Sequence, residues 1–81
     1  MKTNTMHKCF NLWLADNSDC PVKLMIISDI QGDDTITEST FDTNTEWRDS
    51  NGEPIEKSAD ITWASLSAYE TQAETVPDNS N

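Results

Sequence analysis

Acidic side chains recur through the middle of the chain at intervals of three or four residues. The series comprises Asp34, Glu38, Asp42, Glu46, Asp49, Glu53, Glu56 and Asp60. Between its first members lie mostly Thr, Ser and Asn. Carboxylates spaced in this way can bind a divalent cation, act as an acid–base pair, or present negative charge to a basic partner. The choice among these depends on the elements that position them.

Metal-ion and catalytic chemistry are poorly supported by the spacing of the other reactive residues. His7, Cys9 and Cys20 match no standard zinc-ligand spacing. The acidic turns lack the ligand pattern of an EF-hand loop. A His7–Cys9 base–nucleophile pair would lack the third, orienting group. We therefore expect no metal, no cofactor and no catalytic residues, and we predict that the protein is not an enzyme.

Length and charge narrow the class of protein further. Eighty-one residues make a single small domain, and the usual ligand pocket of about 300 Å³ or more is difficult to enclose in one. Fifteen Asp and Glu oppose five Lys and Arg, a net charge of −10. Such a field repels nucleic acid and anionic membranes and attracts basic surfaces. Direct binding to nucleic acid or to a membrane is therefore not expected.

The sequence indicates a cytoplasmic chain. No apolar leader segment precedes residue 10, and the longest apolar run, residues 24–27, is too short to span a bilayer. Both cysteines are then expected to be reduced thiols. If a phage encodes the chain, this compartment is the host cell cytoplasm.

Alternation of apolar and polar residues predicts two strands in the first half. Residues 8–15 place Phe10, Leu12 and Leu14 on one side at period two. Residues 22–30 alternate in the same way and are predicted to form the central strand. Residues 16–21 hold a cluster of turn formers between them.

The acidic segment is predicted to be an exposed strand over residues 35–47. A helix would stack like charges four residues apart and would be filled with poor helix formers. On a strand, Glu38 and Asp42 would share one side at a separation of about 13–14 Å. The pair Asn51-Gly52 then predicts a hairpin turn.

Residues 58–72 fit two interpretations. A strand at residues 60–66 is favoured, and a short helix with Ser58 as its N-cap is the rival. We expect a flexible N-terminus at residues 1–6, a single small domain at residues 7–69, and a disordered acidic tail at residues 70–81.

The predicted fold class is mainly β, a small single antiparallel sheet of three to five strands. The alternative is α+β, with one C-terminal helix packed on the sheet. The predicted core comprises Phe10, Leu12, Leu14, Val22, Leu24, Ile26, Ile36, Phe41, Ile61 and Trp63.

These patterns predict a small acidic binding protein that mimics the phosphate charge of nucleic acid. Carboxylates held at intervals on a rigid sheet can imitate a backbone with one charge per about 3.4 Å per strand. The expected partner is a basic, nucleic-acid-binding host protein. By analogy of class, phages encode small acidic inhibitors of this kind against restriction and CRISPR systems. The predicted partner-binding residues are Asp33, Asp34, Glu38, Asp42, Glu46, Trp47, Asp49, Glu53 and Glu56.

Within that set Trp47 is the expected apolar anchor, because Trp is enriched at interface hot spots. The alternative function is a structural or interaction protein. It would bind a partner, or a second copy of itself as a homodimer, through an apolar sheet face that carries Trp13, Met25 and Ile27.

Overall fold

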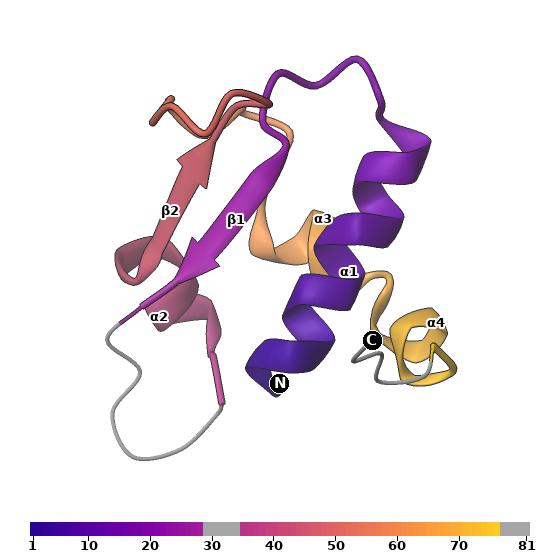
Figure 1. Cartoon of the computed structure of the whole chain (residues 1–81). Helices are drawn as coiled ribbons and strands as arrows, with labels where there is room; N and C mark the ends of the chain where they lie inside the picture. Colours follow the sequence, from indigo (N-terminus) through magenta and orange to yellow (C-terminus); the bar gives the residue numbers. More distant parts are fainter. Residues whose placement is uncertain (29–34, 77–81) are drawn as a thin grey trace.

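The computed structural model describes residues 1–28 and 35–76, which form an α+β fold (Figure 1). The prediction of a mainly β protein is wrong, because 43% of the described residues are helical. Within the described ranges there are four helices and one two-stranded antiparallel sheet. In chain order the elements are α1 (Thr3–Asp16), β1 (Leu24–Ile27), α2 (Glu38–Thr43), β2 (Thr45–Arg48), α3 (Trp63–Ser67) and α4 (Glu70–Glu74).

Helix α1 replaces the strand that was predicted at residues 8–15. Its buried residues are Met6, Cys9, Phe10 and Trp13, each at most 6% exposed. Their spacing of three, one and three residues places them on one helix face. Helix α1 has no side-chain cap at Lys2, so this packed face is its main support. The period-two interpretation failed because Met6, the first residue of the stripe, had been assigned to a flexible N-terminus.

Strands β1 and β2 pair antiparallel, with Met25 opposite Trp47. Both side chains are buried, and the Trp47 ring lies 5.8 Å from that of Phe10 on α1. The neighbouring pairs, Leu24 with Arg48 and Ile26 with Glu46, belong to the opposite, outward face. The central strand predicted at residues 22–30 is thus confirmed for the four residues of β1.

Helix α2 occupies part of the segment that was predicted to be an exposed strand. Thr37 caps it through a reciprocal capping box with Thr40, and Phe41 is 1% exposed. A local cap and one buried aromatic side chain outweigh the low helix propensity of the segment. Glu38 and Asp42 therefore lie one helical turn apart, about 6 Å along the axis, rather than at the spacing of a strand. The end of the predicted strand does form β2.

Helices α3 and α4 both pack against α1. The strand predicted at residues 60–66 is wrong. The alternative prediction of a short helix is correct, although the helix begins at a different N-cap. The N-cap is Thr62, whose Oγ1 accepts the Ser65 N–H at 3.0 Å, rather than Ser58. Helix α4 lies within the predicted tail, and its Ala73 is fully buried. Residues 1–6 and 70–76 therefore belong to the fold.

A row of aromatic rings connects the elements through the core. Centroid separations of 5.8–6.3 Å join, in order, Trp13, Phe10, Trp47, Phe41 and Trp63. The row runs from α1 through β2 and α2 to α3. Offset and edge-on ring pairs of this kind each contribute about 0.5–1.5 kcal/mol beyond the area they bury. The core is thus built by helix-to-sheet contacts and not by a second sheet face.

Half of the predicted core residues are buried. They are Phe10, Val22, Ile36, Phe41 and Ile61. Leu24 is instead 48% exposed, because it belongs to the outward face of the sheet. The remaining four, Leu12, Leu14, Ile26 and Trp63, are half-buried.

Candidate protein-binding surface

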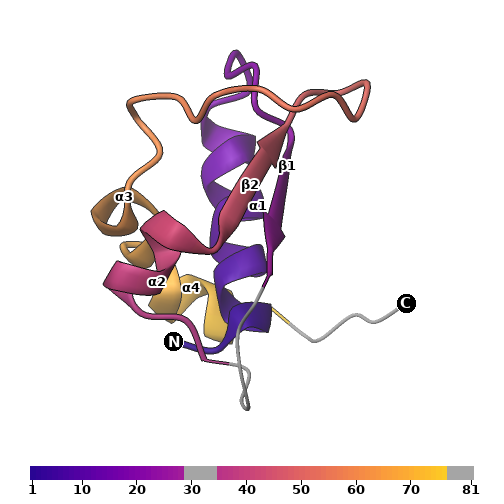
Figure 2. The ribbon, with the colours of Figure 1, turned by 90° about the vertical axis from the view of Figure 1, so that its left-hand side faces the viewer.

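One side of the molecule is formed by α2, β2 and the turn that follows β2. These elements and the segment after the turn carry six members of the acidic series: Glu38, Asp42, Glu46, Asp49, Glu53 and Glu56. Figure 2 faces this side, with α2 near the lower end of β2 and the turn beyond its upper end. The predicted site residues fall on α2 (Glu38, Asp42), on β2 (Glu46, Trp47) and in the segment after it (Asp49, Glu53, Glu56). Asp33 and Asp34 lie outside the described residues.

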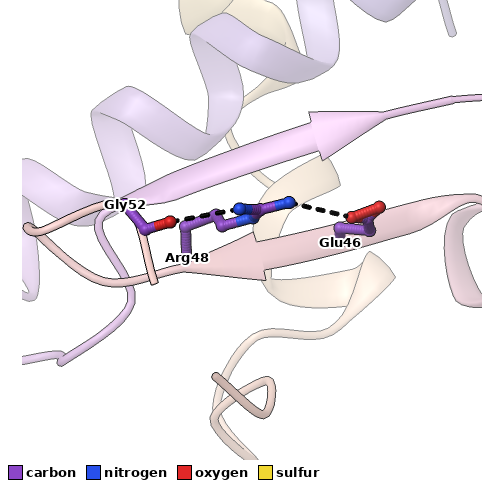
Figure 3. Close-up of polar contacts among 3 residues, drawn as sticks. All are labelled: Glu46, Arg48 and Gly52. Atoms are coloured by element: carbon purple, nitrogen blue, oxygen red, sulfur yellow. Dashed lines mark hydrogen bonds and ion pairs between the residues drawn. The ribbon is translucent and has the colours of Figure 1, made fainter. Parts of the chain in front are cut away.

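Two of these carboxylates make contacts that stabilise the turn after β2. Glu46 Oε2 lies 3.3 Å from Arg48 Nη2, and the Arg48 Nη1 donates to the Gly52 carbonyl at 3.1 Å (Figure 3). Asp49 Oδ1 accepts the backbone N–H groups of Asn51 and Glu53 at 2.8 and 3.0 Å. Glu46 and Asp49 thus hold the hairpin turn, and Gly52 has the positive φ of 80° that the predicted turn requires.

The other four carboxylates of this side are directed to solvent. Glu38, Asp42, Glu53 and Glu56 are exposed. Within residues 1–28 and 35–76 the ion pair is that of Glu46 with Arg48, so none of these four carboxylates forms an ion pair with a described cation. We call these four residues the acidic set. They carry four negative charges available to a partner.

Three lysines of the chain bind main-chain carbonyls. Lys8 Nζ donates to Val76 O at 2.8 Å, Lys23 Nζ to Ser18 O at 2.7 Å, and Lys57 Nζ to Ile61 O at 2.7 Å. Sequence reasoning counted these residues only as charge. No sequence signal marks these contacts, because each depends on where a main-chain carbonyl lies in the fold.

The prediction that Trp47 is a surface anchor does not fit its position. Its side chain is 7% exposed and packs between Phe10 and Phe41. We therefore remove Trp47 from the partner-binding residues. The apolar face of the alternative function is also altered, since Trp13 and Met25 are core residues.

Negative charge is also present away from this side. Glu70 and Glu74 lie on α4, on the far side of α1 from the sheet (Figure 1). Burial, followed by the charges of these two residues, raises the pKa of the Cys9 thiol to about 11. Burial has the opposite effect on the His7 imidazole and lowers its pKa, because burial disfavours the charged form of each group.

Two features are absent from the described part of the chain: a cluster of metal ligands and a helix that could cross a membrane. No group of three His, Cys, Asp or Glu is placed to hold a metal ion among these residues. None of the described helices is long and apolar enough to cross a bilayer.

A cleft of about 250 Å³ opens where the end of α1 meets two loops. It is lined by Trp13, Asn17, Asp19, Cys20, Pro21, Ser58 and Asp60. Cys20 Sγ lies 3.4 Å from Ser58 Oγ, which joins the two loops. Sequence reasoning missed this cleft, because its two walls are about forty positions apart in the chain and carry no shared pattern.

Comparison with known proteins gives no relative from which a function could be transferred. The chain matches no protein-family model, no curated protein and no solved structure.

Proposed function

We propose that the protein is a small acidic, non-enzymatic binding protein. Its acidic side occupies the nucleic-acid-binding groove of a basic host protein and inhibits it, as phage-encoded anti-restriction and anti-CRISPR inhibitors do. The proposal belongs to this class of inhibitor by analogy. The chemistry on which it rests is that of carboxylates meeting Lys and Arg, which form charge-assisted hydrogen bonds.

The observation that carries the proposal is that the positive and the negative side chains make different contacts. The cations Lys8, Lys23 and Lys57 are bound to main-chain carbonyls, whereas the acidic set is exposed without a described ion-pair partner. Unpaired charges of one sign on one side raise the association rate with an oppositely charged surface. Helix α2 supports this function differently from the predicted strand, since it brings two carboxylates within one turn of each other.

The proposal is tested with three double variants that each change the net charge from −10 to −8 by neutralising two carboxylates. E38Q/D42N acts on α2 and E53Q/E56Q on the segment after β2. E70Q/E74Q acts on α4 and is the matched control. A terminally tagged chain captures its partner from lysate, and the captured protein is then assayed for nucleic-acid binding.

We expect the first two variants to weaken capture by about tenfold or more, equivalent to about 1.4 kcal/mol, while the control keeps it. Capture of the parent chain should fall between about 0.1 M and 1 M salt, where the screening length drops from about 10 Å to about 3 Å. The captured protein should lose its nucleic acid when the parent chain is added.

Equal capture by all three variants would contradict the proposal. A salt-resistant complex that is lost in L24S would instead favour an apolar contact, since Leu24 is 48% exposed on the outward face of the sheet.

A further inference from the structure

The pair Asn51-Gly52 at the tip of the turn after β2 can undergo a reaction that the proposed function does not use. We propose that Asn51 is a site of spontaneous deamidation, and that Asp49 slows the reaction by holding the turn closed. Water is the co-reactant, and the product adds a carboxylate to the turn. The reaction involves no partner, so it stands apart from the proposed function.

The nucleophile is the backbone nitrogen of Gly52. After losing its proton to solvent base, this nitrogen attacks Cγ of Asn51. A bond forms between Gly52 N and Asn51 Cγ, the bond from Cγ to Nδ2 breaks, and Nδ2 takes up a proton and leaves as ammonia. Water then opens the cyclic imide at one of its ring C–N bonds. Opening at Cγ gives aspartate and opening at the main-chain carbonyl gives isoaspartate, so an amide and water become a carboxylic acid and ammonia without oxidation or reduction.

Both reacting groups are accessible in the structure. Asn51 and Gly52 are exposed, and the printed sequence contains no other asparagine followed by glycine. Gly52 has no Cβ to obstruct the approach of Asn51 Cγ to its nitrogen. Among the described residues nothing forms a hydrogen bond with the side-chain amide of Asn51, which is therefore free to rotate.

Two other asparagines of the described ranges are less suited to the reaction. Asn17 Nδ2 donates to Trp13 O at 2.8 Å, which holds the leaving group in place. Asn44 Oδ1 accepts a hydrogen bond from Thr43 Oγ1 at 2.8 Å, and the next residue is the β-branched Thr45. Asn17 and Asn44 therefore serve as internal controls.

The closed turn restrains the nucleophile. Gly52 N donates to Asp49 O at 3.0 Å, so the attacking nitrogen is directed at a carbonyl oxygen and keeps its proton. Asp49 Oδ1 also accepts the N–H groups of Asn51 and Glu53 at 2.8 and 3.0 Å, and Asp49 N donates to Glu53 O at 2.9 Å. Attack therefore requires a local opening of the turn, and the Asp49 side chain makes this opening less frequent.

The two products should affect the turn differently. Either one changes the net charge from −10 to −11. Isoaspartate also adds an atom to the main chain before Gly52, which displaces the Gly52 carbonyl from Arg48 Nη1, now 3.1 Å away (Figure 3). Isoaspartate at position 51 should therefore loosen the turn, whereas aspartate should keep it.

The experiment follows the parent chain, D49A and D49N in mildly alkaline buffer over several days. Digested samples are analysed by liquid chromatography and mass spectrometry for the mass gain of an amide-to-acid conversion at Asn51. Aspartate and isoaspartate peptides are separated by retention time. The parent in concentrated urea gives the rate of the open chain, and N51Q, whose longer side chain disfavours the ring, is the site control.

We expect Asn51 to react faster than Asn17 and Asn44 in the folded parent, and about tenfold or more faster in urea than in the folded state. D49A should accelerate the reaction about three- to tenfold, because it removes the acceptor of two backbone N–H groups. D49N keeps an acceptor oxygen and should stay within about threefold of the parent. N51Q should show no gain in this peptide.

The site assignment fails if Asn51 is no faster than the other two asparagines in urea. Equal rates for the folded and the urea-treated parent would overturn the control by the turn, and this comparison holds even if D49A does not fold. If D49A matches the parent, or if D49N accelerates the reaction as much as D49A, the hydrogen bonds of Asp49 are not what slows it. Circular dichroism shows whether each variant is folded before incubation.

Discussion

Gly52 adopts a left-handed backbone conformation, with φ of 80°, at the tip of the hairpin turn. A Cβ added there would meet no atom within 4 Å, so any penalty for substitution comes from the backbone alone. We predict that G52A lowers the free energy of unfolding by about 1–2 kcal/mol. Urea denaturation measures this change.

The control for this prediction is G52N, because Asn tolerates the left-handed region better than Ala does. G52N should be less destabilised than G52A. Equal stability of both variants and the parent would show that residue 52 does not hold this conformation in solution.

The two cysteines should differ sharply in reactivity. Cys9 is fully buried and its pKa is raised to about 11, so at pH 8 its thiol is neutral and inaccessible, whereas Cys20 is half-buried. Because the thiolate is the nucleophile, we predict that iodoacetamide at about pH 8 labels Cys20 first. Mass spectrometry of peptides follows the labelling over time.

In urea both thiols should react at similar rates, and C20S should leave one slowly reacting thiol in the folded chain. Fast labelling of Cys9 under native conditions would contradict its burial among Met6, Phe10 and α4.

Trp47 packs between the rings of Phe10 and Phe41. Its substitution distinguishes a role in the core from a role in partner binding. W47F should lower the free energy of unfolding by about 1–3 kcal/mol, through loss of buried surface, while capture of the partner by the folded variant stays unchanged. Loss of capture without loss of stability would restore Trp47 as an interface anchor.

At the scale of elements, the N-cap of α3 is a separable contribution. Thr62 Oγ1 accepts the Ser65 N–H at 3.0 Å, and T62A removes that acceptor. We predict a loss of about 1 kcal/mol in the free energy of unfolding, measured by urea denaturation. T62S keeps the hydroxyl and should retain most of the stability. A larger loss in T62S than in T62A would exclude the capping role.

The sequence supported strand β1 and the turn at Asn51-Gly52, because their signals are local. It failed at α1, where a short window shows period two and only the inclusion of Met6 reveals the helical stripe. It failed at α2 because a six-residue helix depends on a cap and on Phe41, not on propensity. The exposure of most of the acidic set follows from residue type, but the cleft depends on tertiary packing that chain order does not show.

At the scale of the whole molecule, a net charge of −10 opposes compactness. Raising salt from about 10 mM to about 1 M shortens the screening length from about 30 Å to about 3 Å, so we predict that the melting temperature rises. Circular dichroism at several salt concentrations measures it. E38Q/D42N should show a weaker dependence on salt. A melting temperature that falls with salt would indicate that attractive pairs outweigh repulsion.

The hydrogen bonds from lysine side chains to main-chain carbonyls also have a consequence for chemical labelling. Lys8 Nζ connects α1 to Val76, whereas Lys23 and Lys57 bind carbonyls of their own loops, Ser18 O and Ile61 O. Acetylation or coupling to an amine-reactive dye would convert each ammonium to an amide and weaken these hydrogen bonds. Lys2, which is exposed, is the lysine whose modification would disturb the fold least. Indiscriminate amine immobilisation would therefore select loosened molecules, which is why the capture experiments attach the chain through a terminal tag.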